Sequence, residues 1–464
     1  MAKVPMNIRI IAGVLVMVLS TSAYATGLFL APRGVRPLAR GGAFVAGASD
    51  VNALSYNPAG IALSPEMLTL DFGLPLHSST YTRYVDDPST AFDPVEGQGL
   101  TLPSPTIGGV LRFEELPDWT FAAGILADYP GLQNWPDKLD SGRSAPQRYA
   151  ILNYDGTAIA KLSSAAAWTP FENFSVGLQA ILYSGRFANT VTLSNCDGVI
   201  CTQPENPDYD SAIQVTSDPL FLPGLALGLQ YGWSWGRLGL AYETGYTVDT
   251  ATTVRTRLPA AELYEDAVLI PEVPRGRVSF ELPMALRAGF EILPASDIAI
   301  ELSVVWENWA VHDIIILDAS GAEITEIAAL GSYELGAVEI ERRLENTLCV
   351  RLGGEIGPEI LGVSGLTARL GFAYEPSASP DAYLSAMSVD LDKFIVGSGV
   401  AYEFDQYTVE LTYAAVLMSS REITSSLVQQ TSAARPPWNG RSIIGNGKYE
   451  GSAHIIGLGV HYSL

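Results

Sequence analysis

Apolar and polar residues alternate with a period of two along most of the chain. The segment YTVELTYAAVLM, residues 407–418, places Tyr407, Val409 and Leu411 on one face, with threonine and glutamate residues between them. Segments 224–233, 297–308 and 367–374 alternate in the same way. Such alternation is typical of strands with one apolar and one polar face. We predict roughly fourteen such strands of about ten residues each. Their centres lie near Leu70, Gly109, Ala123, Leu162, Ala180, Leu229, Leu240, Leu286, Leu302, Leu348, Leu370, Gly399, Leu411 and Leu458.

The connections between these strands alternate in length. Short turns hold sequences such as EELPD, PFEN and FDQ, whereas long, polar, Pro- and Gly-rich excursions cover 190–223, 249–276, 310–341 and 419–450. A tilted strand of about ten residues is long enough to cross a bilayer. Short turns on one side and long loops on the other are typical of outer-membrane barrels. The sequence therefore predicts an all-β fold, a transmembrane antiparallel β-barrel of about 14 strands.

Aromatic residues gather beside the short turns. They are Trp119, Trp168, Phe171, Phe174, Trp233, Trp235, Phe404 and Tyr407. Amphipathic rings prefer the membrane interface, so this pattern indicates an aromatic girdle at one end of a barrel. A soluble β-sandwich is the alternative, and it gives no reason for aromatic residues to collect at one end. The last strand, 455–464, also directs apolar residues outward and ends at Leu464.

The N-terminus has the pattern of a secretion signal. Lys3 and Arg9 precede an apolar run from Ile10 to Leu19, and Ala23-Tyr24-Ala25 forms an A-x-A cleavage site. We interpret residues 1–25 as a signal peptide, which predicts export to the bacterial outer membrane. A membrane anchor is the alternative, but a run of about ten apolar residues is too short to span a bilayer as a helix.

The composition excludes several classes of function. The formal net charge is -23 and no cluster of Lys and Arg is present, which argues against nucleic-acid binding. None of the four His residues has a metal-ligand spacing, so we expect no metal and no cofactor. His461 and Ser463 lie two residues apart, as a barrel-wall hydrolase would need, but a polar inner face produces such a pair by chance. We expect no catalytic residue and no enzyme activity.

Two of the three cysteines lie close together in a Pro- and Asp-rich stretch. Cys196 and Cys201 frame the sequence CDGVIC. An oxidising exported compartment favours a local disulfide there. The third cysteine, Cys349, fits an unreactive position in the wall.

The region that follows the signal resembles the N-terminal region of the FadL/TodX family of outer-membrane transporters of long-chain fatty acids and aromatic hydrocarbons. The resemblance rests on the small-residue run 41–48, on Asp50 and on Asn57-Pro58-Ala59. Further pieces follow in order, including PSPTIGGVLRF at 103–113 and ADYPGLQNW at 127–135. The resemblance implies that residues 26–63 form a plug, or hatch, inside a barrel formed by residues 64–464. An ordinary lead-in to the barrel is the alternative.

The resemblance also implies capture of a hydrophobic substrate by apolar extracellular loops. The candidates for capture are Phe221, Leu222, Leu225, Leu258, Leu263 and Tyr264. They could equally pack within the loops. Arg186, Arg369 and Arg351 are candidate inward cations for a carboxylate, although each could instead pair with a luminal acid such as Glu410 or Glu301. The family's own basic residues do not map cleanly onto this chain.

A sideways exit through the barrel wall is a further implication of the resemblance. Tyr129, Pro130 and Gly131 follow the third predicted strand, where proline and glycine would interrupt strand pairing. We expect the wall opening there, unless Pro130 merely ends the strand and begins the next loop. The alternative functions are a general porin and a structural or adhesive barrel. The expected partners are a hydrophobic substrate, outer-membrane lipid, lipopolysaccharide and the barrel-assembly machinery, with the protein itself a monomer.

Overall fold

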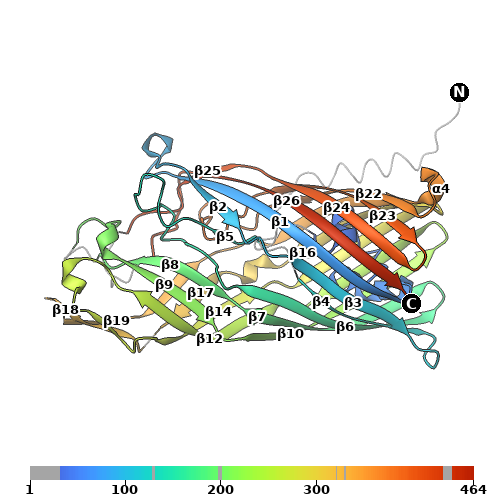
Figure 1. Ribbon diagram of the computed structural model, residues 1–464, viewed down its shortest axis with the longest axis horizontal. Coiled ribbons are helices and arrows are strands. Elements are labelled where there is room, and N and C mark those ends of the chain that lie inside the picture. The colour runs from blue at the N-terminus through green and yellow to red at the C-terminus, as the bar shows by residue number, and fades with distance from the viewer. Residues whose placement is uncertain (1–31, 128–130, 197–200, 320, 329–330, 432–440) are drawn as a thin grey trace.

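The computed structural model describes residues 32–127, 131–196, 201–319, 321–328, 331–431 and 441–464. Fourteen antiparallel strands form a closed ring in chain order, and the last strand pairs with the first (Figure 1). They are β1 (Met67–Arg83), β3 (Ser104–Arg112), β4 (Trp119–Leu126), β6 (Ala158–Phe171), β7 (Phe174–Arg186), β10 (Leu220–Trp233), β11 (Gly236–Glu243), β15 (Ala285–Ala295), β16 (Ile298–Glu307), β21 (Thr347–Ile356), β22 (Leu366–Glu375), β23 (Lys393–Phe404), β24 (Tyr407–Met418) and β26 (Gly447–Ser463). Each contains one of the predicted strand centres, so the predicted barrel is confirmed.

The period-two pattern decides which side chains face outward. On β1, Leu68, Leu70 and Phe72 are 42–49% exposed, while Thr69 and Asp71 between them are buried. Apolar side chains also point outward on the last strand, as predicted, with Leu458 half exposed. Consecutive side chains on a strand point to opposite faces, so the ring has an apolar outer belt and a polar inner face.

The two ends of the barrel differ in the length of their connections. At one end the turns are short, and the turn between β21 and β22 contains the helix α4 (Pro358–Leu361). Exposed aromatic residues border these turns, including Trp119, Trp168 and Phe404 at 36–46%. Trp119 and Trp168 stack on adjacent strands. The predicted aromatic girdle is therefore confirmed at the short-turn end.

The long excursions at the other end are more regular than the sequence suggested (Figure 1). They build a six-stranded sheet and a smaller three-stranded sheet instead of loops alone. The larger sheet contains β8 (Ala188–Ser194), β9 (Asp210–Ser217), β12 (Tyr246–Arg257), β14 (Arg275–Leu282), β17 (Ile314–Asp318) and β20 (Ala337–Glu341). The smaller one contains β13 (Val268–Ile270), β18 (Glu323–Ile327) and β19 (Gly331–Glu334). Thr-rich alternation, as in Thr250, Thr252 and Val254, explains why these strands were missed, because threonine resembles loop composition.

Shorter elements complete the fold. The remaining strands are β2 (Val95–Gly99), β5 (Gln133–Asn134) and β25 (Arg421–Ile423). Single 3-10 turns are η2 (Pro88–Thr90), η3 (Pro207–Tyr209), η4 (Glu262–Tyr264) and η5 (Trp309–Val311). A hydrophobic cluster under these loops joins the segments 145–154, 384–391 and 444–449 and fixes them over the barrel.

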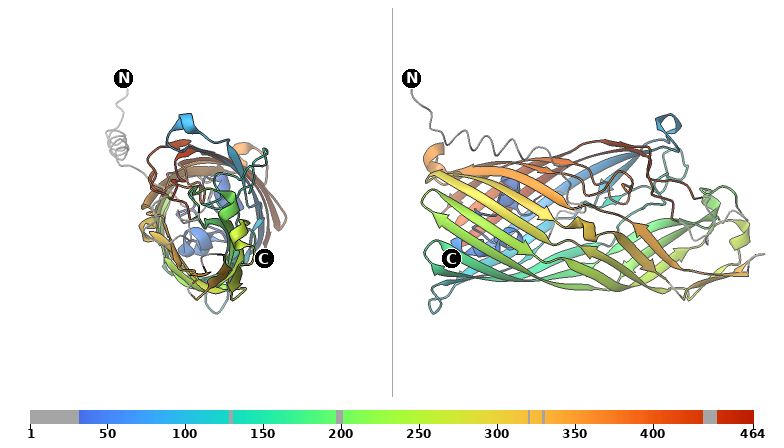
Figure 2. Two further views of the ribbon diagram at one scale, coloured as in Figure 1. Left: turned by 90° about the vertical axis from the view of Figure 1, so that its left-hand side faces the viewer. Right: turned by 180° about the vertical axis from the view of Figure 1, so that it is seen from behind.

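The N-terminal segment, residues 32–63, lies inside the ring (Figure 2). It forms α2 (Val35–Ala39), α3 (Ala53–Tyr56) and η1 (Pro58–Leu63). The α2 helix contacts β22, β23, β24 and β26, and η1 contacts β6, β7 and β10. Within the described residues no helix is long and apolar enough to cross a membrane.

Candidate functional site

Asn57, Pro58 and Ala59 attach the end of the N-terminal segment to the wall. Proline begins η1, and the Asn57 side chain caps it by accepting a hydrogen bond from the Ala59 nitrogen at 3.1 Å. The Asn57 amide also donates to the carbonyl oxygens of Val45, at 2.9 Å, and of Leu229 on β10, at 3.1 Å. One side chain thus shapes the segment and joins it to the barrel.

The wall is adapted to this contact by two glycines. A Cβ atom at Gly177 would lie 2.3 Å from the Ala59 nitrogen, and one at Gly228 would lie 2.2 Å from Asn57 Oδ1. Any larger residue would push η1 away from β7 and β10. Asn57, Pro58 and Ala59 therefore pack against a wall surface made by two glycines, which the sequence did not reveal.

Charged residues attach the rest of the segment. Glu301 on β16 accepts hydrogen bonds from three consecutive backbone nitrogens, those of Val45, Ala46 and Gly47, at 2.6–3.1 Å. Arg40 pairs with Glu291 at 2.8 Å and lies 3.5 Å from Glu301. All these groups are buried, so each charge requires a partner.

Asp50 and Arg369 belong to the same group of ion pairs. Arg36 connects Asp50, at 3.3 Å, with Glu355, at 2.7 Å. Arg369 pairs with Glu355 at 3.0 Å and with Glu410 at 2.8 Å. Arg369 therefore pairs with luminal acids, which was one of the two alternatives that the sequence left open. We call Arg36, Arg40, Arg237 and Arg369, with Asp50, Glu291, Glu301, Glu355 and Glu410, the anchoring network.

Two other sequence candidates also have structural partners. Arg351 pairs with Glu375 at 2.7 Å. His461 contacts Thr69, at 3.0 Å, and lies within 3.6 Å of Asp71 and Glu410. These contacts hold His461 among luminal acids rather than against Ser463.

A cavity of about 470 Å³ lies above the N-terminal segment, between the barrel and the six-stranded sheet. Its lining is mainly aliphatic and aromatic. It includes Leu100, Leu132, Tyr183, Phe187, Val191, Leu193, Ile213, Val215, Leu220, Leu222, Val248, Val278, Phe280, Leu282, Ile315, Leu317, Val338, Ile340 and Met387. The inner face of the sheet supplies many of these side chains, because its alternation places apolar residues inward.

Charged groups lie at the barrel side of this cavity. Glu243 on β11 receives Lys161 of β6 at 3.1 Å and Arg287 of β15 at 3.1 Å. Tyr246 contacts the same carboxylate at 3.3 Å, and Arg33 of the N-terminal segment also lines the cavity. Sequence reasoning missed these residues. Lys161 carried a usable signal, since it is a cation in phase with the inward residues Ser163 and Ala165.

A further cation lines the cavity at its loop side. The Arg342 side chain is buried and donates a hydrogen bond to Ser388 Oγ. No carboxylate lies within ion-pair distance of Arg342 in the described residues, and its Nε atom has no hydrogen-bond partner there. His312 lies nearby with Nδ1 2.6 Å from the Glu281 carbonyl oxygen. Burial lowers the pKa of His312 to about 4, and the Arg342 charge adds to this. Among the described residues, four cations and two carboxylates line the cavity.

The pairing of the wall strands changes beside the cavity. The β4 strand ends at Leu126, opposite Lys161 of β6, so among the described residues 158–160 of β6 pair with β7 alone, and we call this place the gap. Ile159 is in phase with buried Lys161, yet it is 41% exposed. Leu102, across the gap, is 43% exposed and also lines the cavity. Both exposed side chains at the gap therefore belong to the cavity lining.

The gap lies directly after the third strand of the barrel, where the exit was expected. Tyr129 and Pro130 lie outside the described residues, so their part in a kink stays a prediction. Gly131 is half-buried and precedes β5. β5 pairs with β2 rather than continuing β4.

Several predicted capture residues do not face the cavity. Leu222 lines it, but Phe221 and Leu225 point outward from β10 and are 65% and 52% exposed. Leu258, Leu263 and Tyr264 pack with Leu269, Ala322, Ile324, Ile327 and Leu335 in a separate small core. Alternation turns Phe221 and Leu225 outward, and the other three residues pack within the loops, which was the alternative left open by the sequence, so their contact with substrate stays a prediction.

Arg186 is also misplaced by the sequence argument. It ends the outward-facing column of β7 that contains Leu178 and Ala180, and it is exposed. The prediction that Arg186 faces the lumen was therefore wrong, because the alternation along β7 places Arg186 on the outward face.

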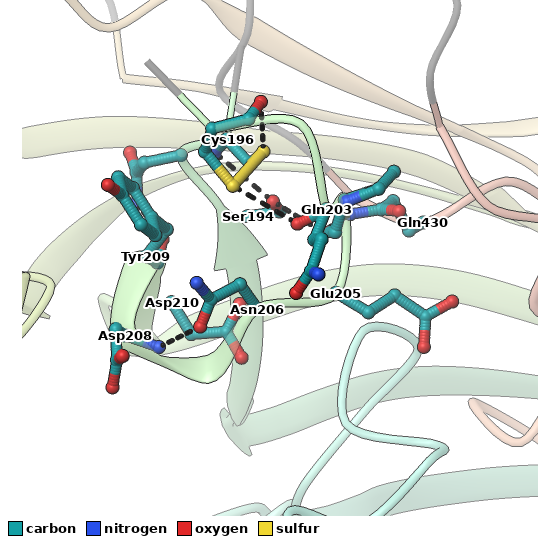
Figure 3. The surroundings of a disulfide bond; sticks show 12 residues. Ser194, Cys196, Gln203, Glu205, Asn206, Asp208, Tyr209, Asp210 and Gln430 are labelled. Atoms are coloured by element: carbon teal, nitrogen blue, oxygen red, sulfur yellow. Dashed lines mark hydrogen bonds between the residues drawn. A yellow bond between two sulfur atoms is a disulfide. The ribbon is translucent and has the colours of Figure 1, made fainter. Parts of the chain in front are cut away.

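The predicted disulfide joins Cys196 and Cys201, whose Cα atoms are 5.0 Å apart (Figure 3). It closes a turn between β8 and β9. Glu205, shortly after it, accepts hydrogen bonds from Arg83 at 2.6 and 2.8 Å. These bonds lower the pKa of Glu205, although burial opposes them. Cys349 is buried in the wall on β21, as expected.

Comparison with known proteins places the chain in a family. Residues 16–464 match the family described as outer membrane protein transport protein (OMPP1/FadL/TodX). No curated protein sequence matches the chain. Among solved structures, a Pseudomonas aeruginosa FadL homologue is similar with a TM-score of 0.72 and 13% identity, covering 95% of this chain and 100% of that one.

Two toluene transporters have the same fold. The P. putida transporter TodX has a TM-score of 0.61 and 16% identity, and covers 94% of this chain and 99% of its own. The Ralstonia pickettii transporter TbuX has a TM-score of 0.61 and 14% identity, with the same coverage. The closed 14-strand ring, the internal N-terminal segment and the family match agree, and the chain is an outer-membrane β-barrel that belongs to the OMPP1/FadL/TodX family of transport proteins.

Proposed function

We propose that this protein takes up elongated hydrophobic molecules that end in an anionic group, such as long-chain fatty acids. The observation that carries the proposal is the cavity itself, which is apolar along its length and is lined by four cations but two carboxylates. An apolar body would displace water from the aliphatic lining. A carboxylate would balance the excess of positive charge.

The barrel side of the cavity is the proposed site of the anionic end. Lys161 and Arg287 share the single carboxylate of Glu243. A cation in an apolar cavity is costly unless it is paired, so a second carboxylate there would bind favourably. An uncharged hydrocarbon such as toluene would make no such contact. This favours an amphipathic acid over a neutral aromatic compound.

Arg342 is the proposed first contact of that anionic end. It lies on the loop side of the cavity, next to Ser388, and has no carboxylate within ion-pair distance in the described part of the chain. An incoming acid would meet Arg342 before it reached Lys161 and Arg287. Neutral His312 beside it adds no competing charge.

The N-terminal segment is the proposed hatch, and the gap beside Ile159 is the proposed exit. Arg33, at one end of the segment, lines the cavity, and the anchoring network holds the segment across the lumen. A straight aqueous path would therefore require the hatch to move. The gap would offer a shorter route to the lipid-facing surface, because Leu102 and Ile159 beside it line the cavity and are exposed.

A general porin and an adhesive barrel are less well supported. A porin requires an open polar lumen, whereas residues 32–63 fill this one. The main sheet of the loops turns an apolar face toward a cavity, which a display role would not require. We also propose that the barrel acts as a monomer, since β1 and β26 of one chain pair along 17 residues and close the ring. We propose that it has no enzyme activity, since its family is one of transport proteins.

One uptake experiment tests both the cargo and the route. Cells that lack their own transporter would express the wild-type protein, Lys161→Met, Ala158→Trp or the control Ala166→Trp, which faces outward on the same strand. We expect Lys161→Met to slow oleate uptake about tenfold, the effect of a lost charge-assisted contact, and to leave dodecane uptake unchanged. Ala158→Trp, at the gap, should slow both cargoes.

Three outcomes would contradict the proposal. Equal slowing of oleate and dodecane by Lys161→Met would remove the head-group assignment. Unchanged uptake in a well-folded Ala158→Trp protein would remove the lateral exit. Toluene uptake without oleate uptake in the wild type would replace the proposed cargo by a neutral aromatic compound.

A further inference from the structure

The outward face of the six-stranded sheet carries most of the exposed positive charge of this acidic protein. Eight Lys and Arg residues are exposed in the described ranges. Five of them lie on or beside this face, and we call them the arginine face: Arg186, Arg255, Arg257, Arg275 and Arg277. The other three, Lys138, Arg143 and Arg343, lie in separate loops. Such a concentration is unexpected in a chain with a net charge of -23.

Strand register places these arginines together. Arg275 lies opposite Thr253 and Arg277 opposite Ala251, so both share the outward face of β12 with Arg255 and Arg257. Arg275 pairs with Asp218 at 2.5 Å, and Arg277 pairs with Asp249 at 2.5 Å. The hydrogen bond from Arg275 lowers the pKa of Asp218, and the charge of Arg186 contributes, so Arg186 belongs to the same electrostatic group.

The arginine face keeps an excess of positive charge. Its neighbouring acids are Asp218, Asp249 and Asp318, which lies opposite Arg277 on β17. Three carboxylates thus lie next to five arginines, and the exposed Glu281 of β14 and Glu339 and Glu341 of β20 share the outward face further along the strands. Arg186, Arg255 and Arg257 make no ion pair or hydrogen bond with a described residue. Even the paired side chains of Arg275 and Arg277 remain 57% and 61% exposed.

The apolar outer belt of the barrel ends directly below this face. On β10, Leu229, Leu225 and Phe221 form an outward column, and Phe221 is 65% exposed. Phe221 lies opposite Ser184 of β7, and Arg186 is the next outward residue along that strand. Diagonal neighbours on paired strands lie about 7–8 Å apart, so hydrophobic surface changes to cationic surface within one side-chain spacing.

We propose that the arginine face binds the phosphate groups of lipopolysaccharide, while its acyl chains lie on the apolar belt at Phe221 and Leu225. Lipopolysaccharide is the phosphorylated glycolipid of the outer leaflet, and its phosphates are attached next to its acyl chains. A guanidinium binds phosphate through two parallel hydrogen bonds. An acidic soluble protein would match the charge but not the adjoining lipid-facing column, so the glycolipid fits both halves of the surface.

Binding to purified full-length protein tests this inference. The patch variant is Arg186→Gln, Arg255→Gln and Arg257→Gln, which removes the three arginines without carboxylate pairs. The matched control is Lys138→Gln, Arg143→Gln and Arg343→Gln, with the same change of charge at exposed positions elsewhere. The probes are bis-phosphorylated lipid A and the same lipid after removal of both phosphates, measured by native mass spectrometry at fixed salt.

We expect the patch variant to bind bis-phosphorylated lipid A at least about tenfold more weakly than wild type, and the control variant within about twofold. Wild type should also prefer the phosphorylated probe. Equal weakening in both variants would mean that net charge alone explains the binding. Equal binding of both probes would mean that only the acyl chains are recognised. Either result, or an unchanged patch variant, would overturn the proposal. Heat-modifiable migration in gels verifies that each variant has a folded barrel.

Discussion

The lumen of this barrel contains two groups of buried charge that are built differently. The anchoring network sets four arginines against five carboxylates, and Glu301 also accepts three backbone N–H groups. The cavity sets four cations against two carboxylates. Removing one partner of a buried pair leaves an uncompensated charge, so near balance is what a fixed attachment requires. An excess of one sign is suited to binding an ion that arrives from outside.

Buried charges on one inner surface therefore serve two purposes, which are attachment of the N-terminal segment and binding of a ligand. Most groups in both regions lie on the inward face of barrel strands and obey the same period-two rule. The two regions contain the same types of charged group. They differ in the number of cations and carboxylates and in the partners that these groups have. The outward arginine face is a third case, in which exposed arginines outnumber their carboxylate partners at the edge of the lipid.

The largest expected effect comes from breaking the balanced network. In Glu301→Leu, the nitrogens of Val45 and Gly47 lose their acceptor and Arg40 loses a nearby carboxylate. We expect the attachment of the N-terminal segment to weaken by about 3–5 kcal/mol, the usual cost of breaking a buried pair. The wall strands should still pair with one another, so the barrel should remain heat-modifiable while its conductance to small ions rises.

Single-channel recordings of Glu301→Leu and of the exposed control Glu341→Leu would measure this. If the Glu301→Leu barrel had the conductance and protease resistance of wild type, attachment of the N-terminal segment would not require the anchoring network.

The second prediction concerns the charged residues of the cavity, where we expect removal of a carboxylate to strengthen an interaction. Glu243→Gln removes the carboxylate that Lys161 and Arg287 share. Both cations would then be available to a ligand, so we expect oleate to bind about tenfold more tightly, while dodecane binding stays unchanged. Isothermal titration in detergent would measure it. Weaker oleate binding would mean that Glu243 positions the two cations for the ligand and is not their competitor.

The smallest effect should come from the loops. His312 has a folded pKa of about 4 against an ordinary value of about 6.5, so its unfolded form takes up a proton first as pH falls. Its contribution to stability is complete above about pH 6.5 and is lost between that pH and about pH 4. Between pH 7 and pH 5 we expect the region around β14 and η5 to lose on the order of 2 kcal/mol.

Hydrogen exchange of amides in 275–282 and 309–317 would report this loss, with β24 as an internal reference. His312→Gln should flatten the pH dependence. An equal pH dependence in wild type and variant would assign the effect to other groups.

Part of the candidate site could be predicted from the sequence. Asn57, Pro58 and Ala59 were identified through a resemblance, and their structural partners proved specific. An exit after the third strand was expected because proline and glycine interrupt a ladder, and it stays a prediction. Lys161, Glu243, Arg287 and Arg342 were not identified, since they come from four separate segments and their meeting depends on ring closure.

The sequence by itself determined the strands, the closed barrel, the outward apolar belt and the aromatic girdle. These follow from a local rule, alternation along a strand, that each segment carries within itself. Only the tertiary structure decided that Lys161, Glu243 and Arg287 meet, that Leu263 and Tyr264 pack in a loop core, and that the long excursions form a sheet over a cavity. Each of these depends on register between strands distant in sequence, and a shift of one residue in register reverses the face of every side chain.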